Sequence, residues 1–113
     1  MRRVVLSFAV VLLGACEGES CDSVEDRAVA AVRDIVDQDQ SCTVDADCVV
    51  VAIHGRCFDV CTRVVATSNE AALRAAIDAA DADICSDYGD CNFIVLPCDA
   101  PAAPRCGDGG QCE

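Results

Sequence analysis

Hydrophobic residues along the chain change from a helical to an extended spacing and back again. From residue 22 to residue 40 they recur at i, i+3 and i+4, which is the spacing of one face of an α-helix. The predicted buried side of this helix comprises Val24, Ala28, Ala31, Val32, Ile35 and Val36. An Asp22–Glu25 pair or a Ser23–Asp26 pair fits a capping box at its start. Pattern and flanking residues therefore both predict a helix.

Two extended runs follow this helix. Residues 49–53 read VVVAI, and such a short β-branched run predicts a strand that is buried on both faces. Residues 59–67 form the second run. The residues between them, around Gly55, suit a turn or loop, so we expect the two runs to pair as a hairpin with an irregular connection.

A second helix is predicted after the hairpin. Residues 67–70 begin it, and Thr67 with Glu70 fits a capping box. Residues 71–82 are rich in alanine, the strongest helix former. The predicted buried side comprises Leu73, Ile77, Ala80 and Ile84. Its spacing is again that of a helix with one face against a core.

The last part of the chain predicts a third strand and a turn. Residues 91–96 form the strand, which Pro97 would end because proline has no N–H to donate. Residues 106–112 are expected to form a tight turn between two cysteines. Together the elements predict one small, disulfide-rich α+β domain over residues 22–113, with two helices on a short antiparallel sheet.

The N-terminal residues differ in composition from this domain. Arg2 and Arg3 precede an apolar run from residue 4 to residue 15. A basic start followed by such a run is the layout of a secretory signal peptide. The run is too short to span a bilayer, which takes about 20 apolar residues. We therefore assign residues 1–15 to a signal peptide.

The end of that run, Leu13-Gly14-Ala15-Cys16, resembles the lipobox of bacterial lipoprotein precursors. In that family a leucine and two small residues precede an obligatory cysteine. The resemblance implies cleavage before Cys16, attachment of diacylglycerol to its sulfur and membrane anchoring through a short tether, residues 16–21. Aspartate after the lipidated cysteine is linked to inner-membrane retention in well-studied lipoproteins. Because Glu17 stands there, the resemblance favours the outer membrane of a bacterial cell envelope.

The cysteine count is consistent with this lipidation. The chain has 11 cysteines, so ten remain if Cys16 carries lipid. An even number in an exported chain predicts a disulfide framework, although ten cysteines allow roughly 945 pairings. The bridged set comprises Cys21, Cys42, Cys48, Cys57, Cys61, Cys85, Cys91, Cys98, Cys106 and Cys112. No Cys-x-x-Cys occurs and His54 has the wrong spacing for zinc, so we assign no metal and no cofactor.

The charge excludes one class of partner. The formal net charge is −12, and removal of Arg2 and Arg3 with the signal peptide would change it to −14. Nucleic acid is excluded as a partner because binding its backbone needs a basic patch. The acidic residues are most simply read as a solvated surface.

Two other functions, a small hydrolase and a calcium-dependent adhesion module, are alternatives to a structural or protein-binding role. A small envelope hydrolase would need a base, a nucleophile and an orienting acid in contact, and His54 is the only histidine. No serine stands in a nucleophile-elbow context, so we assign no catalytic residue. A calcium-dependent adhesion module would use Asp37-x-Asp39-x-Ser41 or Asp81-x-Asp83. The first run does not continue as a calcium loop, because Cys42 stands where glycine is needed, and the second run fails similarly.

The remaining candidate is an interaction loop. Small disulfide-rich domains can present a rigid loop whose preorganisation lowers the entropic cost of binding. His54, Arg56 and Phe58 surround Cys57, and arginine and aromatic residues are favoured at binding hot spots. Residues 99–105 form a second constrained loop. The sequence thus predicts a membrane-anchored lipoprotein whose domain is not an enzyme and is structural or binds a protein of unspecified identity.

Overall fold

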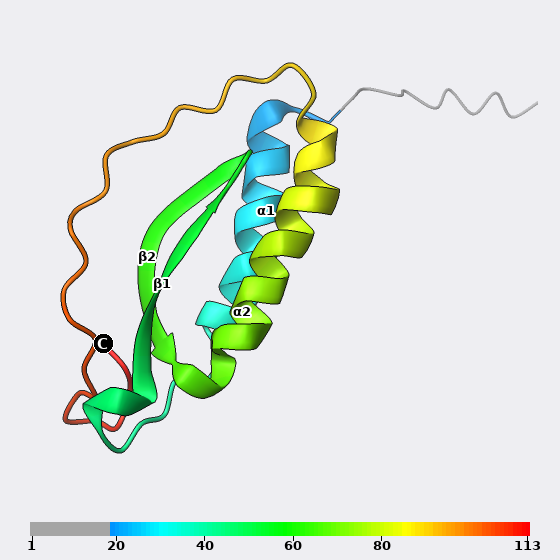
Figure 1. Ribbon diagram of the computed structural model, residues 1–113. Helices are drawn as coiled ribbons and strands as arrows, with labels where there is room; N and C mark the ends of the chain where they lie inside the picture. Colours follow the sequence, from blue (N-terminus) through cyan, green and yellow to red (C-terminus); the bar gives the residue numbers. More distant parts are fainter. Residues whose placement is uncertain (1–18) are drawn as a thin grey trace, which may run out of the picture.

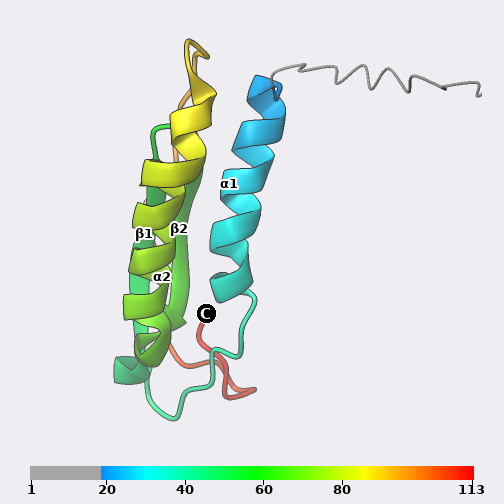
Figure 2. The same ribbon diagram turned by 90° about the vertical axis from the view of Figure 1, so that its right-hand side faces the viewer.

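The computed structural model describes residues 19–113, in which two helices cover one face of a two-stranded antiparallel sheet (Figures 1 and 2). The main elements are, in chain order, α1 (Cys21–Val36), β1 (Cys48–Gly55), β2 (Phe58–Ala66) and α2 (Thr67–Ala79). Three short helical turns accompany them: η1 (Asp45–Asp47), η2 (Ala80–Ile84) and η3 (Cys85–Tyr88). The predicted α+β class is confirmed. The predicted signal peptide and Cys16 lie outside the described residues.

Helix α1 buries part of the predicted stripe but begins at a different cap. Its most buried residues are Val24, Ala28 and Val32, none of which is more than 1% exposed. The side chain of Ser20 accepts a hydrogen bond from the backbone N–H of Ser23 and is the N-cap. The two predicted capping boxes are therefore wrong. The helix starts earlier, at Cys21, so the serine before it lies nearest to the free N–H groups.

Strands β1 and β2 form a hairpin that is buried on one face. Cys48 pairs with Ala66 at one end and Gly55 with Phe58 at the other. Val51 and Ile53 are fully buried, whereas the residues between and after them, Ala52 and His54, are exposed. The prediction of a strand buried on both faces is wrong because both helices pack on the same side of the sheet (Figure 2).

Helix α2 follows β2 without a loop. Leu73 and Ile77 face the core as predicted, and Ala80 of η2 continues this buried side. Ala66 occupies the N-cap position and makes no side-chain capping bond. The predicted Thr67–Glu70 capping box is wrong because Thr67 is already the first helical residue.

Gln40 supplies the missing cap and also ends α1. It is the only buried polar residue among residues 19–113. Its amide nitrogen donates to the carbonyl oxygens of Ile35 and Val36 at 3.0 and 3.2 Å. Its amide oxygen accepts from the backbone N–H of Ala66 at 2.7 Å and from the Asn69 side chain at 3.0 Å. One side chain thus satisfies backbone groups at the end of one helix and the start of the other, and α1 ends at residue 36, not at residue 40.

Five disulfides join all ten cysteines of the described chain. The pairs are Cys21–Cys91, Cys42–Cys106, Cys48–Cys112, Cys57–Cys85 and Cys61–Cys98. Four of them connect residues 91–112 to earlier elements, and only Cys57–Cys85 links two parts of the helix and hairpin layers. The predicted disulfide framework is confirmed, and its connectivity is now defined.

The predicted third strand is absent from the described chain. Residues 91–105 leave η3, arch over the end of the hairpin and descend on the outer side of the sheet (Figure 1). The segment is tied at Cys91 to the first residue of α1 and at Cys98 to β2. These attachments hold it without a strand register. The predicted turn between Cys106 and Cys112 is present, closed by a 2.8 Å hydrogen bond from the Gly107 N–H to the Gln111 carbonyl.

Candidate functional site

The predicted interaction loop between β1 and β2 does not project from the domain. Phe58 is only 1% exposed and belongs to the hydrophobic core, so its predicted role as an exposed anchor is wrong. The reason is local packing. A Cβ atom at Gly55 would lie 2.4 Å from the Phe58 ring, so the glycine lets the turn close tightly over the aromatic side chain.

Arg56 is exposed but is fixed to η2. Its backbone N–H donates to a carboxylate oxygen of Asp81 at 2.6 Å, and its guanidinium donates to the Asp81 carbonyl oxygen at 2.5 Å. The neighbouring Cys57–Cys85 disulfide ties the same turn to η3. The turn is therefore held against the helical layer at two points.

His54 lies at a shallow hollow between this turn and the helical layer. The lining residues are His54, Gly55, Arg56, Ile77, Asp78 and Asp81. The structure thus places carboxylates near the histidine, and no residue of this lining is a serine. The base, nucleophile and acid that a hydrolase of this type needs are not brought together at His54.

Two of the four carboxylates considered for calcium, Asp39 and Asp81, have other partners. Asp39 accepts hydrogen bonds from the Ser41 hydroxyl at 2.6 Å and from the Gln111 amide at 2.9 Å. These bonds, the one from Ser41 first, lower the pKa of Asp39 below its usual value. Asp81 binds Arg56 as described above. Asp39 therefore serves to dock the C-terminal turn near α1, a role that its spacing from Asp37 does not reveal.

Sulfur atoms approach one another closely in two places. Cys42, Cys48 and Cys112 form one group, and Cys61 and Cys98 form another with Asp59. All these cysteines are in disulfides. A metal-binding cysteine must be a thiolate, so the groups as they stand are covalent cross-links.

Three of the four exposed large apolar residues of the described chain are consecutive and lie in the part predicted as the third strand. We call residues 91–98 the apolar segment. Ile94, Val95 and Leu96 are 76%, 60% and 72% exposed, whereas Phe93 packs partly against the core. Within the described chain, no backbone–backbone hydrogen bond involves residues 92–104. The sequence carried no local signal for this exposure, because an apolar run has the same pattern whether or not another layer covers it.

A bulge in β2 positions the far end of the apolar segment. Ile53 pairs with Cys61 and His54 pairs with Asp59, which leaves Val60 without a partner. Cys61 has a φ of 64°, a left-handed conformation that is rare for residues other than glycine. The Asp59 carboxylate accepts a 2.8 Å hydrogen bond from the Cys61 N–H and supports this geometry. The bulge therefore aims the Cys61 sulfur at Cys98, outside the hairpin.

No protein-family model, curated protein or solved structure matches this chain. Among residues 19–113, no helix has the combination of length and apolar composition needed to cross a bilayer. Among the described residues, the apolar segment is the best candidate for a contact surface.

Proposed function

We propose that the chain is an exported bacterial lipoprotein, anchored through Cys16 to the outer membrane, whose domain binds a protein partner and is not an enzyme. The lipobox-like Leu13-Gly14-Ala15-Cys16 supports the anchor. The ten bridged cysteines support export, because disulfides persist in oxidising compartments.

The observation that carries the binding role is the apolar segment. Two separate disulfides fix its ends at Cys91 and Cys98, while Ile94, Val95 and Leu96 face solvent. Covalent attachment at both ends lowers the conformational entropy that binding would otherwise remove. Exposed contiguous apolar side chains are typical of interaction surfaces.

The backbone of the segment supports a binding mode as well. Between residues 92 and 98 its backbone groups are free of backbone partners within the described chain, as in peptides that add a strand to the sheet edge of another protein. The segment has no charged residue, but Asp90 and Asp99 flank it. A partner with an apolar sheet edge and basic residues on either side would complement this surface.

The anchor is tested by the intact mass of the protein extracted from membranes. We expect a lipid adduct on a chain that begins at Cys16, and we expect Cys16→Ala to abolish the adduct. A wild-type product without lipid, beginning at another residue, would refute the anchor without affecting the binding proposal.

The binding surface is tested by a photo-crosslinking amino acid placed at Leu96. Val44, which is 55% exposed and lies far from the segment in the sequence, is the matched control position. In the native cell envelope we expect a discrete protein adduct from position 96 and none from position 44. The adduct from position 96 should also disappear when Ile94→Asp is added. Equal labelling at both positions would contradict a specific contact and leave a purely structural role.

A further inference from the structure

The arginines of this acidic protein fall into two groups. Of the six in residues 19–113, four form ion pairs: Arg27 with Glu19 and Asp87, Arg56 with Asp81, Arg74 with Glu70, and Arg105 with Glu113. Within the described chain Arg33 and Arg63 have no carboxylate within ion-pair distance. The chain has 20 acidic residues, so two unpaired guanidinium groups call for a physical explanation.

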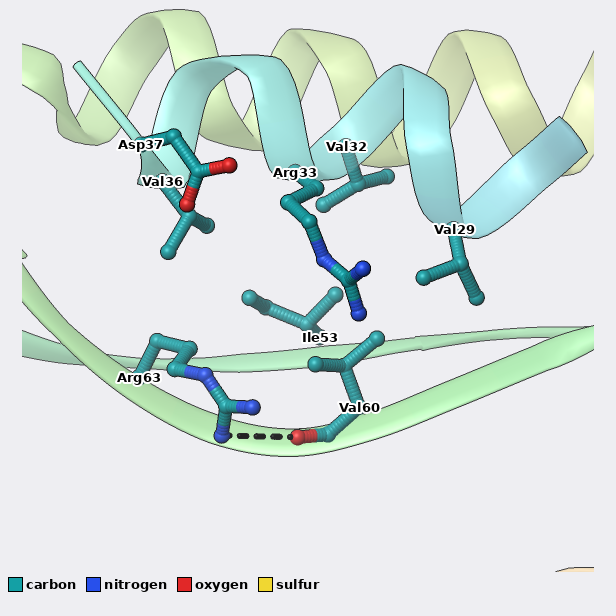
Figure 3. A pocket seen from close by; sticks show the side chains of 8 residues that line it. All are labelled: Val29, Val32, Arg33, Val36, Asp37, Ile53, Val60 and Arg63. Carbon is teal, nitrogen blue, oxygen red and sulfur yellow. Dashed lines mark hydrogen bonds between the residues drawn. The ribbon is translucent and has the colours of Figure 1, made fainter. Parts of the chain in front are cut away.

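Both unpaired arginines lie at the same cavity. It has a volume of about 140 Å³ and lies between α1 and the sheet (Figure 3). Arg33 approaches it from α1 and Arg63 from β2, so the two side chains enter from opposite walls (Figure 3). The other lining residues are five aliphatic side chains and one acid, namely Val29, Val32, Val36, Ile53, Val60 and Asp37.

The Arg63 guanidinium is oriented for a further bond. Its Nη1 atom donates to the carbonyl oxygens of Val60 and Thr62 at 3.3 and 3.0 Å. Both bonds use the same nitrogen, so Nε and Nη2 remain available within the described chain. Those two nitrogens form the edge of a guanidinium that binds a carboxylate with two parallel hydrogen bonds. The bulge at Val60 thus holds the arginine while leaving its carboxylate-binding edge free.

We propose that this cavity binds a small amphipathic carboxylate, with the carboxylate between Arg33 and Arg63 and an apolar chain of about six carbons on the valine and isoleucine floor. A dry apolar cavity of about 150 Å³ accommodates a molecule the size of benzene, which sets this chain length. The site goes beyond the proposed protein-binding function and uses none of the residues of the apolar segment.

Asp37 sets the expected strength and salt dependence. It lines the cavity from the C-cap position of α1, four residues after Arg33, and its negative charge opposes an anionic ligand. Both arginines are exposed, so their attraction for a carboxylate is partly screened by solvent and weakens as salt is added. We therefore expect weak binding, with a Kd on the order of 1 mM at low ionic strength.

The test uses the oxidised chain from residue 16 to residue 113 with Cys16→Ser, which keeps every described residue and needs no detergent because it lacks the apolar run of residues 4–15. Hexanoate is titrated while backbone amide resonances are followed by NMR. Shifts should concentrate at residues 29–37 and 53–63. We expect 1-hexanol to bind about fivefold more weakly, and we expect acetate and hexylamine to give no saturable shifts.

Variants identify the groups responsible. Arg33→Gln and Arg63→Gln should each raise the Kd for hexanoate about threefold, and the pair about tenfold. Arg74→Gln, on α2 away from the cavity, is the control and should change nothing. Asp37→Asn should lower the Kd. Unchanged shifts outside the cavity will show that each variant is folded, because both arginine side chains are on the surface.

Three results would overturn the proposal. One is equal binding of hexanol and hexanoate, which would mean an apolar cavity without anion recognition. Another is an equal change in the Kd for hexanoate in the Arg63→Gln and Arg74→Gln variants. The third is binding of a peptide with a free leucine carboxyl terminus but not of hexanoate, which would assign the site to a protein terminus. None of these outcomes bears on lipidation or on crosslinking at Leu96.

Discussion

The helix and hairpin layers, residues 19–88, and the C-terminal arm, residues 91–113, are held in place by different forces. Every buried residue of the described chain lies between Val24 and Tyr88. The arm has no buried residue, and its backbone hydrogen bonds are confined to its last turn and its first residue. Four of the five disulfides nevertheless end in the arm. The layers are ordered mainly by apolar burial, and the arm mainly by covalent bonds.

This difference explains how an exposed apolar segment can be ordered. A small domain with few aromatic residues cannot bury every apolar side chain. Disulfides fix chain segments without requiring burial, because they restrict the unfolded chain. The arm can therefore leave Ile94, Val95 and Leu96 available for a partner at little cost to folding.

The largest contrast is expected between a core and an arm substitution. Phe58→Ala removes a fully buried ring and should lower the free energy of unfolding by about 3–5 kcal/mol. Leu96→Ala removes an exposed side chain and should change it by less than about 0.5 kcal/mol. Urea unfolding of the two oxidised proteins measures both. Similar losses would mean that the arm is packed as a core element.

The second-largest effect is expected from removal of a disulfide, and it should differ between the layers and the arm. Replacing Cys57 and Cys85 by serine removes a buried disulfide. The free energy of unfolding should fall by about 4 kcal/mol, the upper end of the typical range for one disulfide. Replacing Cys61 and Cys98 by serine should lower the free energy of unfolding by only about 2 kcal/mol, because the disulfide at Cys91 still holds the arm. Limited proteolysis at residues 93–97 should accelerate only in the second variant. Acceleration in both would show that the arm depends on the layers and not on its own bridge.

The Gln40 bonds are expected to have a smaller effect. Gln40→Met keeps the shape but leaves the Ala66 N–H and the Ile35 and Val36 carbonyls without their side-chain partner. The free energy of unfolding should fall by about 1–3 kcal/mol, and the amide hydrogen of Ala66 should exchange faster. Gln38→Met, at an exposed position, should be close to neutral. An equal effect of both variants would contradict the proposed capping role.

The smallest expected effect is a shift in the ultraviolet titration of Tyr88. The Tyr88 hydroxyl donates to Glu25 at 2.7 Å, and this bond, with burial, raises the pKa of Tyr88 to about 12. A raised pKa stabilises the folded state below the usual value of 10.0, and that contribution is lost as the pH rises through 12. Tyr88 is the only tyrosine and there is no tryptophan, so its ultraviolet titration is unobscured.

Glu25→Gln should move the Tyr88 titration midpoint back toward 10, whereas Asp26→Asn should not. Absorbance is read immediately after a pH jump, before alkali attacks the disulfides. A midpoint of 10 in the unaltered protein would show that the contact between α1 and η3 does not form in solution.

The local elements and the chemistry of the cysteines could be predicted from the sequence alone. Hydrophobic spacing located both helices and both paired strands, because the side of a helix or strand that is buried repeats at a fixed period. The count of ten cysteines after Cys16 indicated a disulfide framework. These features depend on neighbours within a few positions or on composition alone.

Which distant residues meet could be read only from the three-dimensional packing of the chain. It selected one pairing of the ten cysteines, turned Phe58 inward, made Gln40 a cap for two helices and placed Arg33 and Arg63 at one cavity. Residues 91–96 looked like a strand because an apolar run has the same local pattern whether or not another layer covers it. Whether that layer exists depends on the packing of the whole chain, and in this protein disulfides hold the run in the open.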